Sequence, residues 1–248
     1  MAVNWNFVQK EEQTRRLGYV PIDTKGRPIE NSGLTIATGV DLGQMNQRQI
    51  RGLFHYGLSE SLINKLLPFA KDGDFSFAKG RLTTCGQDNE HLTVKKQNSV
   101  CKDAGLFDRQ TVVTPRDKPV LSLDEGEVTS LDKAVREQKI KVIEGHFNNL
   151  ATAGGGKRFV AQSEGAQTVV ASFCWQNGEN CFGRLGRKDK QAIGESIATE
   201  NRVQAVLLLV RFGRSYGHFP RRRREADLIE NECDTAERSQ IQESLSSP

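Results

Sequence analysis

Residues 32–44 read SGLTIATGVDLGQ and carry a strong local structural pattern. The β-branched residues within Leu34–Thr38 predict a short strand. Glycines on both sides of Val40-Asp41-Leu42 predict a bend that presents Asp41. Residues 23–33, which come before, are rich in turn-forming types. We therefore expect a small β-hairpin in this part of the chain.

A helix is predicted on the N-terminal side of this hairpin, over Trp5–Leu17. Its apolar residues lie between charged ones, and Gly18 follows in the position of a C-terminal cap. A pair of glutamates, Glu11 and Glu12, lies near the end of the predicted helix.

Most of the remaining chain predicts helices. Apolar residues recur at helical spacing, and residues that can cap a helix precede several of these segments. The predicted helices are 46–67 with caps at Asn46 and Ser59, 75–82, one from Ser122 through Ile143 that opens with a capping box of Ser122 and Glu125, 163–175, 193–212, and 220–229. The predicted fold class is therefore α+β, mostly helical with a small N-terminal β-hairpin lobe.

The domain organisation follows from length and composition. The 248 residues can bury one sizeable core, and no internal repeat divides them, so we expect a single domain over residues 1–248. Residues 83–119 are polar with little periodicity and are expected to be an insertion. Residues from about 235 are expected to form a flexible acidic tail.

The composition excludes several classes of protein. A hydrophobic fraction of 36% together with 23 glycines is that of a globular chain. No apolar run approaches the roughly 20 residues that cross a bilayer, so no membrane span is expected. Residues 1–10 lack the apolar core of a signal peptide, so we expect a protein made in the cytoplasm. The net charge of +4 permits attraction to nucleic acid, anionic membranes or cell wall without selecting one.

The sequence has no motif for a metal or an organic cofactor. It lacks the glycine-rich nucleotide-binding patterns, the G-x-S-x-G elbow and H-E-x-x-H. Its four histidines have no metal-ligand spacing, and its five cysteines form no C-x-x-C. We therefore expect no cofactor and no metal. Cys174 and Cys181 flank a turn-like segment, which leaves open a disulfide between them in an oxidising compartment.

Carboxylates near the hairpin are typical of an enzyme that cleaves glycosidic bonds. Such cleavage needs one carboxylic acid to protonate the leaving oxygen and a second carboxylate on the other face of the sugar. A glutamate on the helix and Asp41 after the hairpin would lie on two walls of a cleft. The alternative is structural: the glutamates form a solvated helix face, Asp41 caps the next helix, and Thr35 is an ordinary strand residue.

Two groups of residues resemble a known family. GYVP at residues 18–21 and SGLTIATGVDLGQ at residues 32–44 resemble the signature of pesticin-type muramidases, which are peptidoglycan-cleaving toxins and effectors related to the phage lysozymes. Residues 67–69, 163–178 and 216–226 resemble later parts of the same family. The resemblance covers roughly residues 5–72 and 120–232, and residues 83–119 have no counterpart in it.

The resemblance implies a lysozyme-like fold and a catalytic set of one glutamate, one threonine and one aspartate. Thr35 and Asp41 match in type and spacing. The family has Glu-Gly at the helix end, where this chain has Glu11-Glu12-Gln13, so Glu12 is the expected residue and Glu11 the alternative.

Each of these residues has an expected role. Glu12 would be the general acid, which requires partial burial among apolar neighbours. Asp41 would be the ionised partner that activates water or stabilises the transition state, and Thr35 would hold the attacking water. The resemblance also implies inversion at the anomeric carbon, with carboxylates about 6.5–9.5 Å apart.

The implied activity is hydrolysis of the β-1,4 bond between N-acetylmuramic acid and N-acetylglucosamine in peptidoglycan glycan strands. The expected route to that substrate is injection into the periplasm of a target bacterium by a contact-dependent apparatus such as type VI secretion. This implies a component of that apparatus and a periplasmic immunity protein as partners. The alternatives are a phage-type endolysin, or a non-catalytic cell-wall or nucleic-acid binding protein, although no nucleic-acid partner is expected.

Two further features have both a functional and a structural interpretation. The basic cluster Arg221–Arg224 could bind nucleic acid or cell wall. Alternatively, its arginines form ion pairs with Glu225, Asp227 and the acidic tail, and we expect these ion pairs. Trp175 is expected to lie in the core rather than to stack on a sugar.

Overall fold

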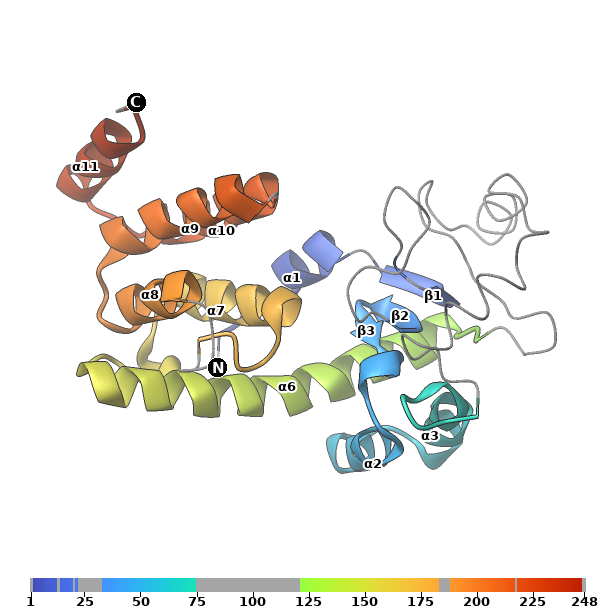
Figure 1. Cartoon of the computed structure of the whole chain (residues 1–248). Coiled ribbons are helices and arrows are strands. Elements are labelled where there is room, and N and C mark those ends of the chain that lie inside the picture. The colour runs from blue at the N-terminus through green and yellow to red at the C-terminus, as the bar shows by residue number, and fades with distance from the viewer. Residues whose placement is uncertain are drawn as a thin grey trace, which may run out of the picture. The chain divides into compact units, whose positions relative to one another are not determined.

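The computed structural model describes residues 2–12, 14–19, 21, 33–74, 121–182, 188–216 and 218–246 (Figure 1). The chain divides into two compact units. Glu12–Gln138 form the sheet unit, and Met1–Glu11 with Lys139–Pro248 form the helical unit. The expectation of a single domain stays a prediction. The predicted helix over 75–82 and the predicted insertion over 83–119 lie outside the described residues.

The sheet unit contains a three-stranded antiparallel sheet in the order β1-β2-β3. Tyr19 on the first strand pairs with Thr35 on the second, and Thr35 pairs in turn with Asp41 on the third. The predicted N-terminal β-hairpin lobe is confirmed, and it has a third strand. The strands are β1 (Thr14–Tyr19), β2 (Thr35–Thr38) and β3 (Val40–Asp41).

The first helix is shorter than predicted. It is α1 (Trp5–Glu12), and β1 begins at Thr14, so the extension of the helix to Leu17 is wrong. Gly18 lies inside the strand, where its N–H donates to the carbonyl of Leu121 (2.8 Å). Pairing with distant residues outweighs the local helical pattern here, as is common where a sheet forms. The two glutamates nevertheless end the helix, as expected.

Short helices follow the sheet, and their predicted caps are confirmed. The Asn46 side chain accepts from the backbone of Gln49, whose side chain reaches back to Asn46, which completes a capping box. Ser59 accepts from the Leu62 N–H. These elements are η1 (Leu42–Gln44), α2 (Gln47–Gly52), η2 (Leu53–Tyr56), α3 (Glu60–Leu66) and η3 (Leu67–Phe69).

The longest helix, α6 (Glu125–Gly154), opens two residues later than the predicted capping box implies. Asp124 accepts from the Glu127 N–H (2.7 Å), and Glu127 accepts from the Asp124 N–H (2.9 Å). The predicted box of Ser122 and Glu125 is therefore wrong, because Ser122 is taken up in an isolated bridge to Leu17. The buried residues of α6 recur at helical spacing as predicted; they include Leu131, Val135, Ile140 and Ile143.

Gly145 weakens α6 at an exposed position. Nothing lies within 4 Å of the place where a Cβ would stand, and the backbone there is helical. Gly145→Ala is expected to raise the free energy of unfolding by about 0.5–1 kcal/mol, because alanine loses less backbone entropy in a helix. Urea denaturation followed by circular dichroism measures this change, and a lower stability would contradict the open surroundings of Gly145.

The helical unit packs around a buried helix, α7 (Glu164–Asn177), which was predicted over 163–175 and is capped by Ser163. Every residue from Ala166 to Trp175 is buried. The N-terminal segment binds this helix: the Ala2 N–H donates to Gln167 (3.0 Å) and the Asn4 N–H donates to Thr168 (2.9 Å). The other helices of the unit are α8 (Lys188–Ala198), α9 (Arg202–Tyr216), α10 (Phe219–Glu230) and α11 (Thr235–Ser246), with η4 (Phe159–Ala161) before α7.

Two predictions for the helical unit are wrong. The helix predicted over 193–212 is two helices, because Glu200 adopts a left-handed φ of 57° between them and Asn201 then accepts from the Gln204 N–H. A flexible tail was expected from about 235, but α11 lies there. Its first turn is held by reciprocal bonds between Asp234 and Glu237, and Ile241 is fully buried.

The described cysteines are free thiols. Cys174, Cys181 and Cys233 are buried, and the sulfur atoms of the first two lie 2.8 Å apart in a thiol contact rather than a disulfide. Within the described residues, no helix has the length and hydropathy needed to span a bilayer.

Candidate active site

Asp41 is held at the end of β3 by hydrogen bonds to its carboxylate. The Gly33 N–H lies 3.1 Å from Oδ1 and 3.2 Å from Oδ2, and the Gln44 side-chain amide donates to Oδ2 at 3.0 Å. Burial raises the pKa of Asp41 above its ordinary value, and these hydrogen bonds to the ionised form partly offset that rise. The result is an oriented, half-buried carboxyl group.

Thr35 lies directly opposite Asp41 in the sheet. Its hydroxyl donates to the carbonyl of Gly33 (3.3 Å), and the side chain is buried. Directly paired residues of an antiparallel sheet have side chains on the same face. The structure therefore brings together two of the three residues that the sequence predicts for the site.

Glu12 is linked to the same group through Tyr19. The pKa of Tyr19 is raised to about 12, mainly by burial, and the negative charges of Glu12 and Asp41 add to this rise while Arg15 opposes it. Tyr19 also pairs with Thr35 in the sheet, so it lies beside Thr35 and within the electrostatic influence of Glu12 and Asp41. The expected separation of the two carboxylates stays a prediction.

Glu11 lies in a different environment. Both of its oxygens accept from Arg224 of α10, from Nε and from Nη2 at 2.6 Å each. The Glu11 side chain is 5% exposed, whereas that of Arg224 is 50% exposed. Both residues belong to the helical unit.

Tyr19 and Arg15 were not predicted as site residues. The Arg15 guanidinium lies over the Tyr19 ring, 4.6 Å from its centroid, and both side chains are buried. Tyr19 is part of the GYVP segment at residues 18–21, and the resemblance of this segment to the pesticin-type family could have indicated it. No local pattern singled out Arg15, because the sequence placed it in a helix rather than in a strand.

The loop that carries Asp41 depends on two glycines in contact. A Cβ built on Gly33 would overlap the Cα of Gly43, and the reverse holds for Gly43. This approach places the Gly33 N–H on Asp41. No larger residue fits at either position without moving the backbone.

Gly43→Ala is expected to separate these segments and to weaken the hydrogen bond from Gly33 to Asp41. The extra methyl group should cost about 1–3 kcal/mol of stability, as overpacking does elsewhere. Hydrolytic activity should fall more than the folded fraction does, and Gly145→Ala is the matched control. Wild-type activity in a folded Gly43→Ala variant would show that this contact does not position Asp41.

Asp41→Asn is expected to affect stability in a pH-dependent way. Because the folded-state pKa of Asp41 is raised, the folded protein holds this proton more tightly than the unfolded chain. This contribution is fully present below the unfolded pKa and is lost as the pH rises through the folded pKa. Asparagine avoids the buried charge, so the variant should melt at a higher temperature than wild type at neutral pH, with a smaller difference in acid. A lower Tm at neutral pH would show that the hydrogen bonds outweigh burial.

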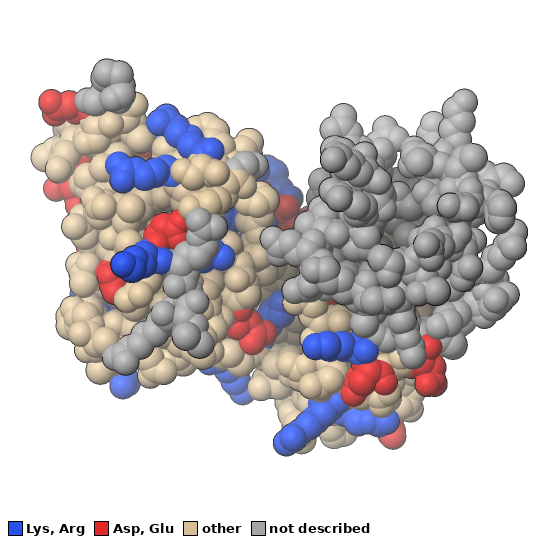
Figure 2. All heavy atoms as spheres, viewed as in Figure 1, with Lys and Arg blue, Asp and Glu red and all other residues tan. Residues whose placement is uncertain are grey.

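The basic cluster is engaged in ion pairs, as expected. Arg221 and Arg222 contact Glu225 (3.3 Å and 2.7 Å), Arg223 contacts Asp227 (2.7 Å), and Arg224 contacts Glu11. On the face shown in Figure 2, basic and acidic side chains of the described residues are interspersed.

Trp175 is a core residue, as expected. It is buried and packs edge-on against Trp5, with ring centroids 6.0 Å apart.

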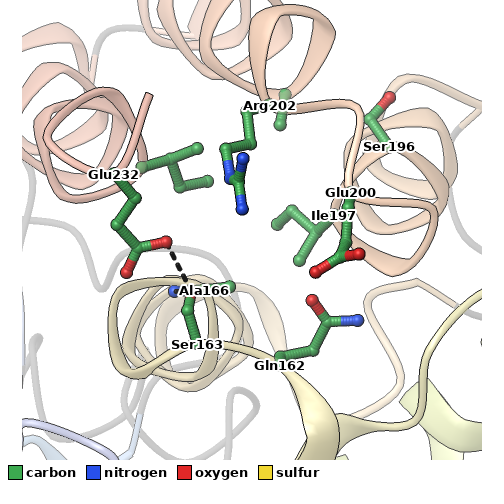
Figure 3. Close-up of a pocket in the computed structure, with 10 residues that line it drawn as sticks. Gln162, Ser163, Ala166, Ser196, Ile197, Glu200, Arg202 and Glu232 are labelled. Carbon is green, nitrogen blue, oxygen red and sulfur yellow. Dashed lines mark hydrogen bonds between the residues drawn. The ribbon is translucent and has the colours of Figure 1, made fainter. Parts of the chain in front are cut away.

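A small cavity in the helical unit is lined by polar groups (Figure 3). Arg202 extends from the start of α9 into the space between Glu200 and Glu232. The cavity measures about 20 Å³, which is room for one water molecule. It is too small for a sugar. Glu232 at its edge accepts from Ser163 and from the Gly165 N–H, which caps α7.

Glycoside hydrolases typically use a pair of carboxyl groups for catalysis, and here a hydroxyl group lies beside one of the two predicted carboxyl groups. Within the described residues, no three His, Cys, Asp or Glu side chains form a metal site. Residues 2–85 match the pesticin family, described as a bacterial toxin homologue of phage lysozyme, C-terminal part. A search of curated proteins finds no match to the chain.

The matched region contains α1, the three strands and all three predicted site residues. It confirms the pesticin-type resemblance and, with the mostly helical structure and its small sheet, the lysozyme-like α+β fold class. The similarity indicates a lysozyme-type peptidoglycan hydrolase.

Proposed function

We propose that this protein is a muramidase that hydrolyses the β-1,4 bond between N-acetylmuramic acid and N-acetylglucosamine. One observation carries the proposal: Thr35 and Asp41 are paired across the sheet, and the charges of Asp41 and Glu12 both act on Tyr19. These residues lie in the part of the chain that matches a homologue of phage lysozyme.

In the proposed mechanism, Glu12 donates its proton to the glycosidic oxygen as the bond to the anomeric carbon breaks. The Asp41 carboxylate accepts a proton from the water that attacks this carbon, and the configuration is inverted. The Thr35 hydroxyl donates to Gly33, which leaves its oxygen lone pairs available to accept a hydrogen bond from that water. Asp41 must be ionised for this role, so its raised pKa should move the acid limb of the rate profile upward.

Glu11 is the weaker candidate for the acid. A general acid must lie within hydrogen-bond reach of the glycosidic oxygen. Both oxygens of Glu11 are instead bound by Arg224. The charge of Glu12, like that of Asp41, acts on Tyr19. Glu12 is therefore our choice.

We propose further that the protein is an antibacterial effector that acts on peptidoglycan in the periplasm of a target cell. The support is the description of the matched family as bacterial toxins. A specialised secretion apparatus would deliver it, and a periplasmic immunity protein would protect the producer.

The proposed activity is tested by digesting purified peptidoglycan and analysing the fragments by mass spectrometry. Wild type should release muropeptides with reducing N-acetylmuramic acid ends, and folded Asp41→Asn should not. Reducing N-acetylglucosamine ends would show a glucosaminidase instead. Binding without release of fragments would show a cell-wall binding protein and would contradict the catalytic assignment.

The proposed site of action is tested by targeted expression in a Gram-negative host. Export of wild type to the periplasm should lyse the cells, whereas cytoplasmic expression and exported Asp41→Asn should not. Equal toxicity from both compartments would contradict a periplasmic target. A neighbouring gene for a small exported protein that binds this one tightly would support the effector, whereas a holin gene would favour an endolysin.

A further inference from the structure

Asp132 on α6 binds the turn that leads to Asp41. Its Oδ1 accepts from the Thr38 N–H at 3.0 Å, and its Oδ2 accepts from the Thr38 hydroxyl at 2.5 Å. Thr38 and Asp132 are both almost fully buried. One carboxylate therefore fixes both the backbone and the side chain of the last residue of β2.

The same hydroxyl connects Thr38 to the segment that follows Glu12. The Thr14 and Thr38 hydroxyl oxygens lie 3.1 Å apart, and the two residues are paired in the sheet. Because the Thr38 proton is donated to Asp132, Thr14 is the donor in this contact. Thr14 stands two residues after Glu12 and Thr38 three residues before Asp41, so the two threonines flank the proposed acid and base.

The backbone around Thr38 is strained. Ala37 has a φ of 52° and Gly39 a φ of 70°, so residues in the left-handed region lie on both sides of Thr38. For alanine this conformation is unfavourable, because its Cβ approaches the following carbonyl. Such geometry persists only where surrounding contacts impose it, and it clusters at functional sites. The two bonds from Asp132 are contacts of this kind.

Asp132 is costly to keep buried. Arg136 lies 3.6 Å away, one turn along the helix, and provides the counter-charge. Removal from water still dominates and raises the pKa of Asp132 above its ordinary value. An apolar residue at this position of α6 would avoid that cost, so the retained carboxylate points to a role beyond helix packing.

We propose that Asp132 is a positioning residue that holds the Glu12 and Asp41 segments through the Thr14–Thr38 pair. This inference rests on the proposed hydrolase function. Asp132 contacts Thr38 rather than a group assigned to the reaction, so it acts on catalysis through the placement of others. Small displacements of catalytic groups are expensive, since a shift of about 1 Å lowers rates about 10²-fold.

The test uses substitutions at both ends of the hydrogen bond. Thr38→Val removes the hydroxyl at nearly constant shape, and Asp132→Ala removes both acceptors. Each is expected to lower kcat on peptidoglycan about 10–100-fold with little change in KM, at a temperature where the protein is fully folded. Thr38→Ser and Asp132→Asn, which keep partners for these bonds, should restore most of kcat. The double variant Thr38→Val with Asp132→Ala should lose less than the product of the single effects.

Glu127→Gln is the matched control on the same helix. Glu127 caps α6 and pairs with Lys65 but touches neither threonine, so its loss lowers stability without moving the site. Wild-type kcat in folded Thr38→Val, or losses equal to those of Glu127→Gln, would overturn the proposal.

Hydrogen exchange separates this proposal from the proposed function. The Thr38 amide should exchange at least about 10-fold faster in Asp132→Ala than in Asp132→Asn or Glu127→Gln, since only Asp132→Ala removes its acceptor. Peptidoglycan that stays intact with wild type would refute the hydrolase, while faster exchange would still establish the anchor. Unchanged exchange would refute the anchor, whatever the activity.

Discussion

Glu12→Gln is expected to lower the rate of peptidoglycan hydrolysis by about 10²–10⁴-fold, the range for loss of a general acid. Glutamine keeps the size of the side chain but carries no proton to give to the leaving oxygen. KM should change little, because the interaction is used in the transition state rather than in binding. Reducing-end release under single-turnover conditions measures the effect.

Glu11→Gln is the matched control for this prediction, since it changes the adjacent residue by the same single group. It weakens an ion pair in which Arg224 is half exposed and Glu11 is 5% exposed, so a modest loss of stability is expected. Activity should remain close to wild type. Loss of activity in Glu11→Gln alone would show that Glu11, rather than Glu12, is the general acid. It would contradict the assignment based on Tyr19.

Glu225→Gln is expected to lower the free energy of unfolding of the helical unit by about 3–5 kcal/mol, as loss of one partner of a buried ion pair does. Glu225 and Arg222 are both fully buried, with Oε2 and Nη1 2.7 Å apart. Arg221 and Ser172 contact the other oxygen of Glu225. A neutral glutamine leaves two buried guanidinium groups without their counter-charge.

Urea denaturation followed by tryptophan fluorescence measures this loss. Both tryptophans, Trp5 and Trp175, lie in the helical unit and in contact with each other, so the signal reports on that unit. Asp227→Asn is the control on the same helix, because the Asp227 side chain is 44% exposed and its pair with Arg223 should contribute less than about 1 kcal/mol. Equal losses in the two variants would contradict a special role for burial.

The sequence predicted the features that depend on local pattern. The buried spacing of α6 and α7 and the caps Asn46 and Ser59 are of this kind. The bend that presents Asp41 after the strand of Thr35 was also predicted, although the pairing of Val40–Asp41 with that strand was not. In each case neighbouring residues determine the structure.

The features that the sequence did not predict depend on distant partners. The strand Thr14–Tyr19 pairs with β2 and touches Leu121, and these contacts outweigh its helical pattern. The hydrogen bond from the Thr38 N–H to Asp132 joins residues 94 positions apart, and no sequence-spacing rule predicts such a contact. The composition of α11 is mostly polar and therefore resembles that of a tail, but its Ile241 is fully buried and Leu245 also packs against the core.

The contacts of Ala2 and Asn4 with α7 have a consequence for folding during synthesis. Ala2 and Asn4 leave the ribosome before their partners Gln167 and Thr168, which follow about 165 residues later. An eight-residue helix such as α1 is marginal without tertiary support. The helix that ends in Glu12 should therefore become stable only after α7 has emerged, so that hydrolytic competence is one of the last properties the nascent chain acquires.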